Sequence, residues 1–554
     1  MAGRSSIAGW FADNEAAQAT VLQFIKDREA GDPTSVLDFL HRLQTEYGFP
    51  FTSEPSLVRH LKAHGMGRRV LVIEATPEDD GLASYCMTRS RARAIRKARR
   101  WVVTAAQNNT PVDAEFLKAL ETYAAENNAE IIVRPIRYKN PTSNIVPEHE
   151  VPDGMWWDPA LAQYLVDDEI ETKDVVIPDV RIAATAANPL VGLDARSGLK
   201  HGVYGATQLA MKTVATLYEN LPKILYSTGA VTVPNYSTTK SGNLAEFHHS
   251  MSAIIIEQDR RGRTFLRSVT WDGESFIDID RQYTAHGSSE RAPSWSALVT
   301  GDEHAWFVDP KVKEATYLSP DSMVAIGQPD FVVRHDVLDC YSISHHHDGN
   351  ALIQRNKATF GWSNLRKELN DTLGYIEETT TTDFTNIIVS SNHNDHLSRW
   401  LSSGERGVTP ENKLIYHELM VVMLASAERR DTGAAMVNPF EAYANQYYIG
   451  EDEIQFLSGK KAFMIHDIDV SQHGHSGPNG SRGSRNNLSK IGAKTVIGHS
   501  HSPGIVGGCW QVGTSSRMDL EYLSGPSSWL HCHCVIHANG KRQLLPIIDG
   551  KWRA

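Results

Sequence analysis

Apolar positions recur at helical spacing in the first 68 residues. Ala16–Arg28 and Pro33–Tyr47 place apolar side chains every three or four residues, which is the repeat of an amphipathic helix. Another apolar segment follows a Gly-Phe-Pro turn, with Ser53 or Ser56 as its candidate N-cap. We expect residues 1–68 to form a helical module, either a DNA-contacting helix-turn-helix or a docking or oligomerisation domain.

After residue 68 the pattern changes to short runs rich in Val and Ile. In residues 69–170, these runs alternate with one segment whose apolar residues recur at helical spacing. This alternation predicts a small α/β layer. Residues 171–295 contain Val, Ile and Thr runs between turn dipeptides, which predicts a β-rich region. We expect strands at 68–75, 100–106 and 129–138 and a helix at 112–128.

In residues 296–554, five apolar strands each run into side chains that can bind a metal ion. Strand ends meet at one edge of a sheet, so this pattern predicts a layered α/β domain with a site at that edge. A carboxylate can bridge two cations, and amide oxygens and imidazoles are further ligands. The polar ends are Asp302 and His304 after SALVTG, Asp336 after DFVVRH, Asn392 and His393 after TNIIVSS, His473 after DIDVSQ, and His499 and His501 after KTVIG.

Length, charge and cysteine content limit the class of protein. With 554 residues, the chain is expected to form two to four domains. Five cysteines without framework spacing, no secretory signal and no apolar run of about 18–20 residues predict a soluble cytoplasmic protein without a membrane span. A net charge of −11 excludes a protein that coats nucleic acid over its whole surface, but it permits a local basic patch.

The five motifs, in this order, resemble the calcineurin-like metallophosphoesterase superfamily, whose pattern is D-x-H, G-D, G-N-H-D/E, an isolated H and G-H-x-H. The resemblance covers 301–503 and implies a four-layer α/β/β/α sandwich with two divalent metal ions. It implies a two-metal-activated hydroxide that attacks phosphorus, with His393 approaching the leaving group. By the family pattern, one metal is held by Asp302, His304, Asp336 and His501, and the second by Asp336, Asn392, His473 and His499.

The residue types also bear on the metal. A His, Asp and Asn shell without thiolate suits manganese, zinc or iron better than calcium. The resemblance to nucleases of the superfamily favours Mn²⁺, with Zn²⁺ or Fe²⁺ as alternatives.

The sequence departs from the family pattern at three positions. His335 and Ser391 stand where the family has glycine, and Asn394 separates His393 from the acidic residue, Asp395, that we expect to assist it. The first two departures are compatible with the pattern if the backbone there has ordinary angles.

His473 has rivals as the isolated histidine. His475 follows two residues later and His466 lies on the preceding strand. His473 is favoured because it is the first His of H-G-H, and His475 is then a candidate contact to a substrate phosphate.

Further candidate substrate contacts lie outside the motifs. The segment Arg89–Arg100, RSRARAIRKARR, predicts a basic helix face that includes Arg93, Arg96 and Arg100, and Trp101 could stack on a base. A solvated helix face is the alternative. His346, in a histidine triplet, and Arg482, in a Gly- and Ser-rich loop, are candidate phosphate contacts. A polar surface loop is the alternative for each, and for Arg482 the phosphate contact is favoured because its loop follows His473 directly.

The segments TAANPLVGLDARSG, PKILYSTGAVTVPNY and EFHHSMSAIIIE extend the resemblance to phage-encoded metallophosphoesterases of T-five-type coliphages, grouped with SbcD-type repair nucleases. This implies a phage DNase that degrades host DNA, is linked to phage DNA transfer and acts in the host cytoplasm, as a homo-oligomer with phage or host partners. One alternative is a cyclic or small-nucleotide phosphodiesterase that counters host signalling, which would need neither the basic cluster nor the large non-catalytic half. The other is a DNA-binding regulator, against which the complete ligand set argues.

Overall fold

The computed structural model divides the chain into two compact units. One comprises residues 1–77 with 84–93, and the other comprises 78–83 with 94–554. Each unit is described by itself. The structure describes residues 10, 14–29, 36–50, 57, 61, 89–138, 156–217, 221–287, 289–347, 349–380, 383–428, 437–448, 450, 454–458, 460–520 and 525–554.

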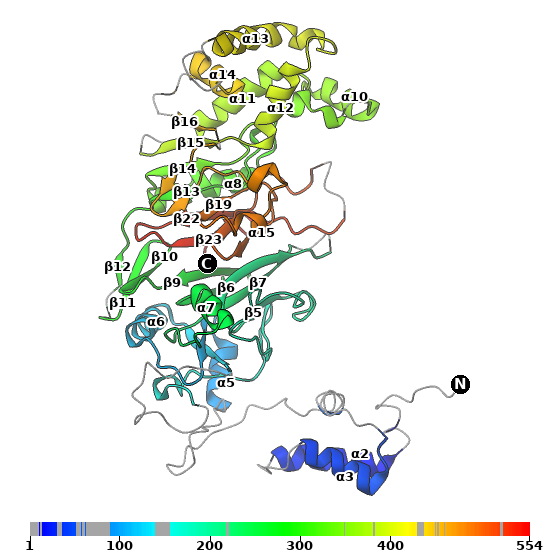
Figure 1. The fold of residues 1–554 in the computed structure, drawn as a ribbon, viewed down its shortest axis with the longest axis vertical. Helices are drawn as coiled ribbons and strands as arrows, with labels where there is room; N and C mark the ends of the chain where they lie inside the picture. Colours follow the sequence, from blue (N-terminus) through cyan, green and yellow to red (C-terminus); the bar gives the residue numbers. More distant parts are fainter. Residues whose placement is uncertain are drawn as a thin grey trace. The chain divides into compact units, whose positions relative to one another are not determined.

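The first unit is built on two helices, α2 (Glu15–Glu29) and α3 (Val36–Tyr47), drawn in blue in Figure 1. Their apolar faces meet, with the rings of Phe24 and Phe39 stacked at 3.8 Å. Both predicted helices are confirmed. The candidate caps Ser53 and Ser56 lie outside the described residues, so the helix-turn-helix interpretation stays a prediction.

A four-stranded sheet, ordered β2-β1-β8-β9, begins the second unit. The parallel pair β1 and β2 is joined by α6 (Ala114–Asn127), which Asp113 caps by accepting a hydrogen bond from Phe116 N. These elements confirm the predicted strands at 100–106 and 129–138 and the helix between them, whereas 68–75 lies outside the described residues. The strands are β1 (Arg100–Gln107), β2 (Glu130–Ile136), β8 (Ser252–Gln258) and β9 (Thr264–Thr270).

Since β8 pairs with β1, residues on both sides of the expected boundary at 170 share a sheet. A smaller sheet follows in the chain, ordered β10-β11-β12. Its strands are β10 (Ser275–Asp278), β11 (Arg281–Thr284) and β12 (Ser289–Arg291).

A ten-stranded sheet, ordered β17-β18-β19-β21-β20-β6-β7-β5-β4-β3, crosses the expected boundary at residue 295. It is continuous because β20 pairs antiparallel with β6, where Ile505 lies opposite Met211. The β-rich middle region and part of the motif-bearing region therefore form one sheet. The strands are β3 (Ile170–Glu171), β4 (Val175–Ile177), β5 (His201–Tyr204), β6 (Ala206–Val214), β7 (Lys223–Gly229), β17 (Met464–Ile465), β18 (Ile468–Asp469), β19 (Lys494–Ile497), β20 (Gly504–Val506) and β21 (Cys509–Gln511).

A six-stranded sheet, ordered β16-β15-β14-β13-β22-β23, carries the remaining motifs. Its first four strands run parallel, so their carboxyl ends lie at one edge. The strands are β13 (Ala297–Val299), β14 (Phe331–Arg334), β15 (Thr385–Val389), β16 (Ile454–Leu457), β22 (Cys532–Ile536) and β23 (Arg542–Pro546).

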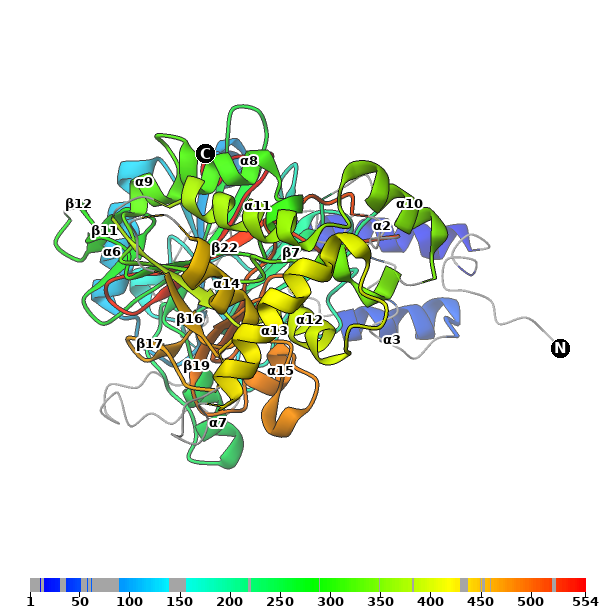
Figure 2. The same ribbon diagram turned by 90° about the horizontal axis from the view of Figure 1, so that it is seen from above.

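Helices cover the six-stranded sheet and bury its apolar side chains. One core cluster joins Ile388 of β15 to α11, α12, α13 and α14. Figure 1 shows these helices gathered beside β15 and β16, and Figure 2 shows α14 next to β16 from above. A second cluster joins Leu298 and Val332 to α8 and α9. The helices are α8 (Pro310–Lys313), α9 (Met323–Gly327), α11 (Leu365–Glu378), α12 (Asn392–Ser402), α13 (Lys413–Glu428) and α14 (Pro439–Tyr447).

The described part of the chain is thus mixed α/β, with several sheets and helices. Among its helices, none is both long and apolar enough to cross a membrane. The remaining helices are α5 (Arg89–Lys97), α7 (Lys240–His248), α10 (Ala351–Phe360) and α15 (Arg485–Leu488).

Candidate metal centre

The five motif ends converge on one buried place between the two large sheets. The six-stranded sheet supplies the residues after β13, β14 and β15, and the ten-stranded sheet supplies those after β18 and β19. Two groups of side chains that share Asp302 have ligand atoms that all lie within 4.8 Å of one another, and a third group, His304, Asp339 and His393, overlaps the first of them. The two groups that share Asp302 are Asp302, His304 and His501, and Asp302, Asp336 and His473.

In the first group, one carboxylate and two imidazoles face one another. His501 Nε2 lies 3.1 Å from Asp302 Oδ2 and 3.2 Å from His304 Nε2. All three side chains are buried. Buried imidazole nitrogens that point at each other and at a carboxylate are arranged as ligands of a shared cation would be.

The second group extends to the asparagine and the remaining histidine. His473 Nε2 lies 3.1 Å from Asp336 Oδ2 and 3.0 Å from Asn392 Oδ1, and His499 Nδ1 lies 3.0 Å from the same amide oxygen. All seven predicted ligands are thus brought together. The two groups share Asp302, whereas the family pattern places Asp336 between the metals.

The backbone holds these side chains in conformations that residues other than glycine rarely adopt. His304, Asp336, His499 and His501 have φ of 47°, 45°, 79° and 57°. Backbone strain of this kind persists where the surrounding structure enforces it. One such restraint is visible at Asp302, whose two carboxylate oxygens accept hydrogen bonds from His499 N at 3.1 and 2.9 Å.

Gly498 is required at this contact. A Cβ added there would overlap Asp302 Oδ1 and would crowd the ring of His335. Glycine therefore lets the strand end at β19 approach the strand end at β13.

Asp339 is the residue that the sequence analysis missed. Its Oδ1 accepts a hydrogen bond from His304 Nδ1 at 2.6 Å and lies 3.1 Å from His393 Nδ1, which donates to Asp339 O at 2.7 Å. Burial alone would raise the pKa of Asp339, but His393 and His304 outweigh it and hold that pKa well below its usual range. Asp339 therefore orients both His304, a candidate metal ligand, and His393, the candidate general acid.

His393 lies at the opening of the site, with its side chain 24% exposed. Its Nε2 is 3.9 Å from Asp336 Oδ2. Burial would lower the pKa of His393, but the charges of Asp336 and Asp339 outweigh it and raise the pKa to about 10. The imidazole is therefore protonated at neutral pH.

The three departures from the family pattern have structural explanations. Ser391 has an ordinary φ of −131° and caps α12 by accepting a hydrogen bond from Asn394 N. His335 also lies outside the positive-φ region, and its Nδ1 is 3.3 Å from His473 Nδ1, which leaves His473 Nε2 facing the site. Asn394 is buried beneath the cap.

Asp395 does not face His393. Its carboxylate is half-exposed and lies 3.7 Å from His475 Nε2. The carboxylate beside His393 comes instead from Asp339, because α12 begins at Asn392 and its helical turn directs residue 395 away from residue 393. The expected role of Asp395 as the partner of His393 is thus corrected by the geometry.

A buried ion pair supports the first motif from below. Glu303, between the two ligands of D-x-H, contacts Arg334 at 3.1 Å, and both side chains are fully buried. Arg334 also donates hydrogen bonds to Asn386 and Thr379, and Tyr317 donates to Glu303. The pair fixes the backbone that presents Asp302 and His304, and it gave no recognisable signal in the sequence.

Comparison with known proteins places the chain in a family. Protein A1 of Escherichia phage T5 is 31% identical over 494 residues, which cover 86% of this chain and 86% of that protein. The chain belongs to the family of this phage protein. No family model matches the chain, and no solved structure matches it.

Of the predicted substrate contacts, His475 and Arg482 lie near the metal centre. His475 lies beside it, with ring centroids 5.5 Å from His473 and 6.1 Å from His499, and Arg482 is exposed on a cavity that His499 also lines. The side chain of His346 lies outside the described residues. His466, the other rival of His473, contacts Ser296 instead.

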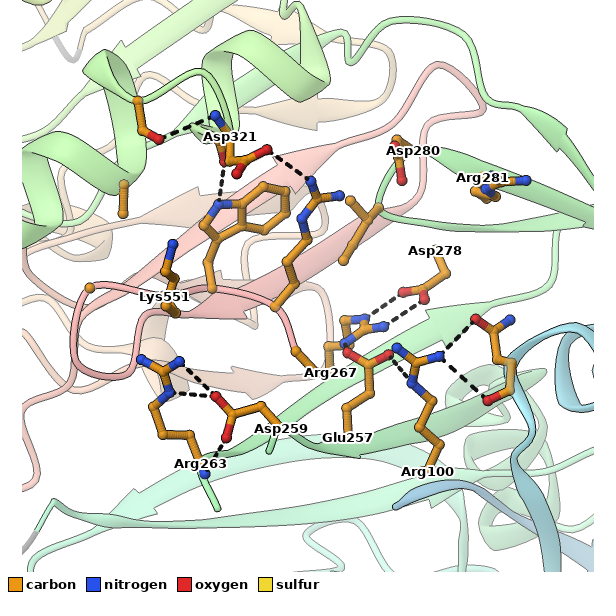
Figure 3. Close-up of a pocket in the computed structure, with 18 of the residues that line it drawn as sticks. Arg100, Glu257, Asp259, Arg263, Arg267, Asp278, Asp280, Arg281, Asp321 and Lys551 are labelled. Atoms are coloured by element: carbon orange, nitrogen blue, oxygen red, sulfur yellow. Dashed lines mark hydrogen bonds and ion pairs between the residues drawn. The ribbon is translucent and has the colours of Figure 1, made fainter. Parts of the chain in front are cut away.

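The basic cluster is only partly as predicted. Arg93 and Arg96 are exposed on α5, but the helix ends at Lys97, so Arg100 belongs to strand β1. Figure 3 shows Arg100 directed at Glu257, with Arg100 Nε 3.1 Å from its carboxylate. Trp101 is buried and donates to Ile95 O at 2.8 Å, so the predicted base stacking by Trp101 is wrong.

The donor set fits divalent cations. Asp336 Oδ1 and His501 Nδ1 are buried, and neither has a hydrogen-bond partner in the described part of the chain. Burial would raise the pKa of Asp302, but His473 and His501 outweigh it and lower that pKa to about 2. Buried carboxylates that remain charged need a compensating positive charge, and the surrounding oxygen and nitrogen donors, without sulfur, suit Mn²⁺, Zn²⁺ or Fe²⁺.

Proposed function

We propose that the chain is a metal-dependent phosphodiesterase of the calcineurin-like superfamily that cleaves DNA in the cytoplasm of the infected host. The observation that carries the proposal is the convergence of five strand ends, from two sheets, on one buried cluster of side chains, in which Asp302 is shared by two candidate ligand groups. The two large sheets, each with part of the motif set, support an α/β/β/α sandwich.

Two divalent cations, for which we propose manganese, would supply Lewis-acid polarisation of the phosphoryl oxygens and offset the charge that develops there. The residues that would hold them are Asp302, His304, Asp336, Asn392, His473, His499 and His501.

The protein's own contribution to the chemistry centres on His393. The charge of Asp339 favours the protonated imidazole, and His393 stands at the opening of the site, so Nε2 can donate a proton to the leaving oxygen. Asp339 holds Nδ1 of the same ring, which directs Nε2 toward the substrate side. Asp339 also holds His304, so one carboxylate couples the position of the acid to that of a ligand.

Two observations support DNA as the substrate. Arg93 and Arg96, three residues apart on α5, present two exposed guanidinium groups in a chain that is acidic overall. The similar protein also comes from a phage. A cyclic-nucleotide phosphodiesterase would need the metal centre but not the basic helix.

The test is cleavage of linear duplex DNA by the purified chain with Mn²⁺. Cleavage is expected to stop on chelation and to be lost in Asp336→Asn, which keeps the shape of the side chain. Hydrolysis of a cyclic dinucleotide with DNA left intact would replace the DNase proposal by the small-nucleotide one. No hydrolysis of any phosphodiester would reject both.

The role of the basic helix is tested through salt. Each phosphate contact contributes about −0.9 to the slope of log K against log salt. Replacing Arg93 and Arg96 by Gln should therefore flatten the slope for DNA binding by about 1.8. Arg100→Gln is the control, since Glu257 already pairs with Arg100, and an equal effect there would assign the salt dependence elsewhere.

A further inference from the structure

A cavity of about 640 Å³ opens beside the candidate metal centre. His499 lines the cavity and also belongs to the metal centre, while the segment 188–191 and strand β6 form another part of the wall. β6 is brought there by its pairing with β20, where Met211 lies opposite Ile505. A ligand in this cavity would therefore lie next to a phosphate at the metal centre.

The charged side chains that line this cavity are all positive. Lys212, Arg482 and Arg485 line it, and none of its described lining residues is Asp or Glu. Asp194 neutralises Lys212 at 2.7 Å, which leaves the two arginines. The cavity is thus suited to an anion.

A second cavity of the chain shows the contrast. Its lining contains arginines and carboxylates together, and Figure 3 shows them paired. Arg267, for example, binds both Asp278 and Glu257. Paired charges of this kind leave no preference for an anion.

Arg485 is held ready for a ligand. It begins α15 directly after the N-cap Ser484, and its guanidinium packs against Gly504, where an added Cβ would overlap Nη1. Nη1 is buried and has no hydrogen-bond partner among the described residues. A buried guanidinium nitrogen without a hydrogen-bond partner is costly, so a phosphate that reaches Arg485 from the cavity would be stabilised by the guanidinium fork.

The rest of the wall is apolar. Leu190, Met211 and Ile505 line the cavity and are buried, and Val191 lies at the wall with 72% of its surface exposed. Apolar walls with a few fixed polar groups are typical of sites for small organic groups.

We propose that this cavity binds the nucleotide next to the scissile phosphate. Its phosphate contacts Arg482 and Arg485, and its base packs against Leu190 and Met211. This inference rests on the proposed function, because it deepens the substrate assignment of the same site. A base held against these walls cannot pair with a complementary strand, so the cavity selects strands with an unpaired nucleotide at this position.

The test measures hydrolysis of two substrates by the 554-residue chain in the presence of Mn²⁺. One is a single-stranded oligonucleotide, and the other is bis(4-nitrophenyl) phosphate, which lacks an adjacent phosphate. Arg485→Met should raise KM for the oligonucleotide by about tenfold or more, as expected for loss of a charged hydrogen bond. Hydrolysis of the small diester should not change. Val191→Asp, at an exposed position, should also raise KM for the oligonucleotide because it repels a phosphate.

The matched control is Arg355→Met, which changes an exposed arginine of α10 outside the cavity and should alter neither rate. An equal loss of hydrolysis on both substrates in Arg485→Met would assign Arg485 to the metal centre and overturn the proposal. Unchanged hydrolysis of both substrates in this variant would also overturn it.

If the wild-type chain hydrolyses neither of these substrates nor linear duplex DNA, the proposed function fails, and the cavity is tested by calorimetry with chelator present. A deoxynucleoside monophosphate should then bind more tightly than inorganic phosphate, and Arg485→Met should remove the difference. Equal dissociation constants in the wild type would overturn the nucleotide site.

Discussion

Asp339 offers the sharpest test of the site, because Asp339→Asn keeps the shape of the side chain and removes only its charge. Two imidazoles depend on that charge, His304 at 2.6 Å and His393 at 3.1 Å. A hydrogen bond to a charged group contributes about 1.5–3 kcal/mol, and one between neutral groups about 0.5–1.5 kcal/mol. Replacing the charged acceptor by a neutral one at two hydrogen bonds therefore costs about 2 kcal/mol, which corresponds to about 30-fold in rate.

The assay is phosphodiester hydrolysis as a function of pH, together with titration of Mn²⁺ binding. Asp339→Asn should lower kcat/KM about 30-fold, within the range of about 10–100-fold typical of groups that orient metal ligands. Asp339 also raises the pKa of His393, which is about 10 in the wild type. A general acid must be protonated to act, so activity declines above its pKa. The alkaline limb of the pH profile should therefore shift to lower pH in Asp339→Asn.

The control is Asp395→Asn, the same change at the acidic residue that the family pattern favours. Its carboxylate is half-exposed and faces His475 instead of His393, so we expect little loss of activity. A larger loss in Asp395→Asn than in Asp339→Asn would refute the assignment. An unchanged alkaline limb in Asp339→Asn would refute the proposed link between Asp339 and His393.

Three further predictions concern other parts of the chain. Arg334→Met leaves Glu303 buried without its partner and should cost about 3–5 kcal/mol of stability, and Glu303→Gln in the same chain should recover part of the lost thermal stability. Burial lowers the pKa of His537 to about 4, so the folded chain keeps it neutral while the unfolded chain takes up a proton below about pH 6.5. Stability should therefore fall by about 2 kcal/mol between pH 7 and pH 5 through this residue, and urea unfolding of His537→Phe should lack that part of the loss. Gly498→Ala should push Asp302 out of place and abolish Mn²⁺ binding while the circular dichroism spectrum is kept, and normal binding would contradict the close approach.

Local patterns predicted the strands beside the motifs well. Each predicted ligand follows a short apolar run, and those runs are β13, β14, β15, β18 and β19. The reason is physical, since alternation and burial are local properties of a strand and strand ends are where polar groups can gather.

The missed residues depend on contacts between distant parts of the chain. Asp339 meets His304 and His393 only after the sheet has formed, and nothing in the sequence around Asp339 distinguishes this buried residue from an aspartate at the surface. The basic run was misassigned at Arg100 for a related reason. Its charge suggested one continuous helix, but pairing of β1 with β8 places Arg100 opposite Glu257.

The pairing of β20 with β6 has a consequence for dissecting the molecule. A fragment that starts at residue 296 would keep every candidate ligand but would lose β6, and β20 would become an open sheet edge with Ile505 uncovered. Open edges of this kind recruit other strands and lead to aggregation. The motif-bearing region is therefore not a portable module, and an insoluble fragment would say nothing about the chemistry of the intact chain.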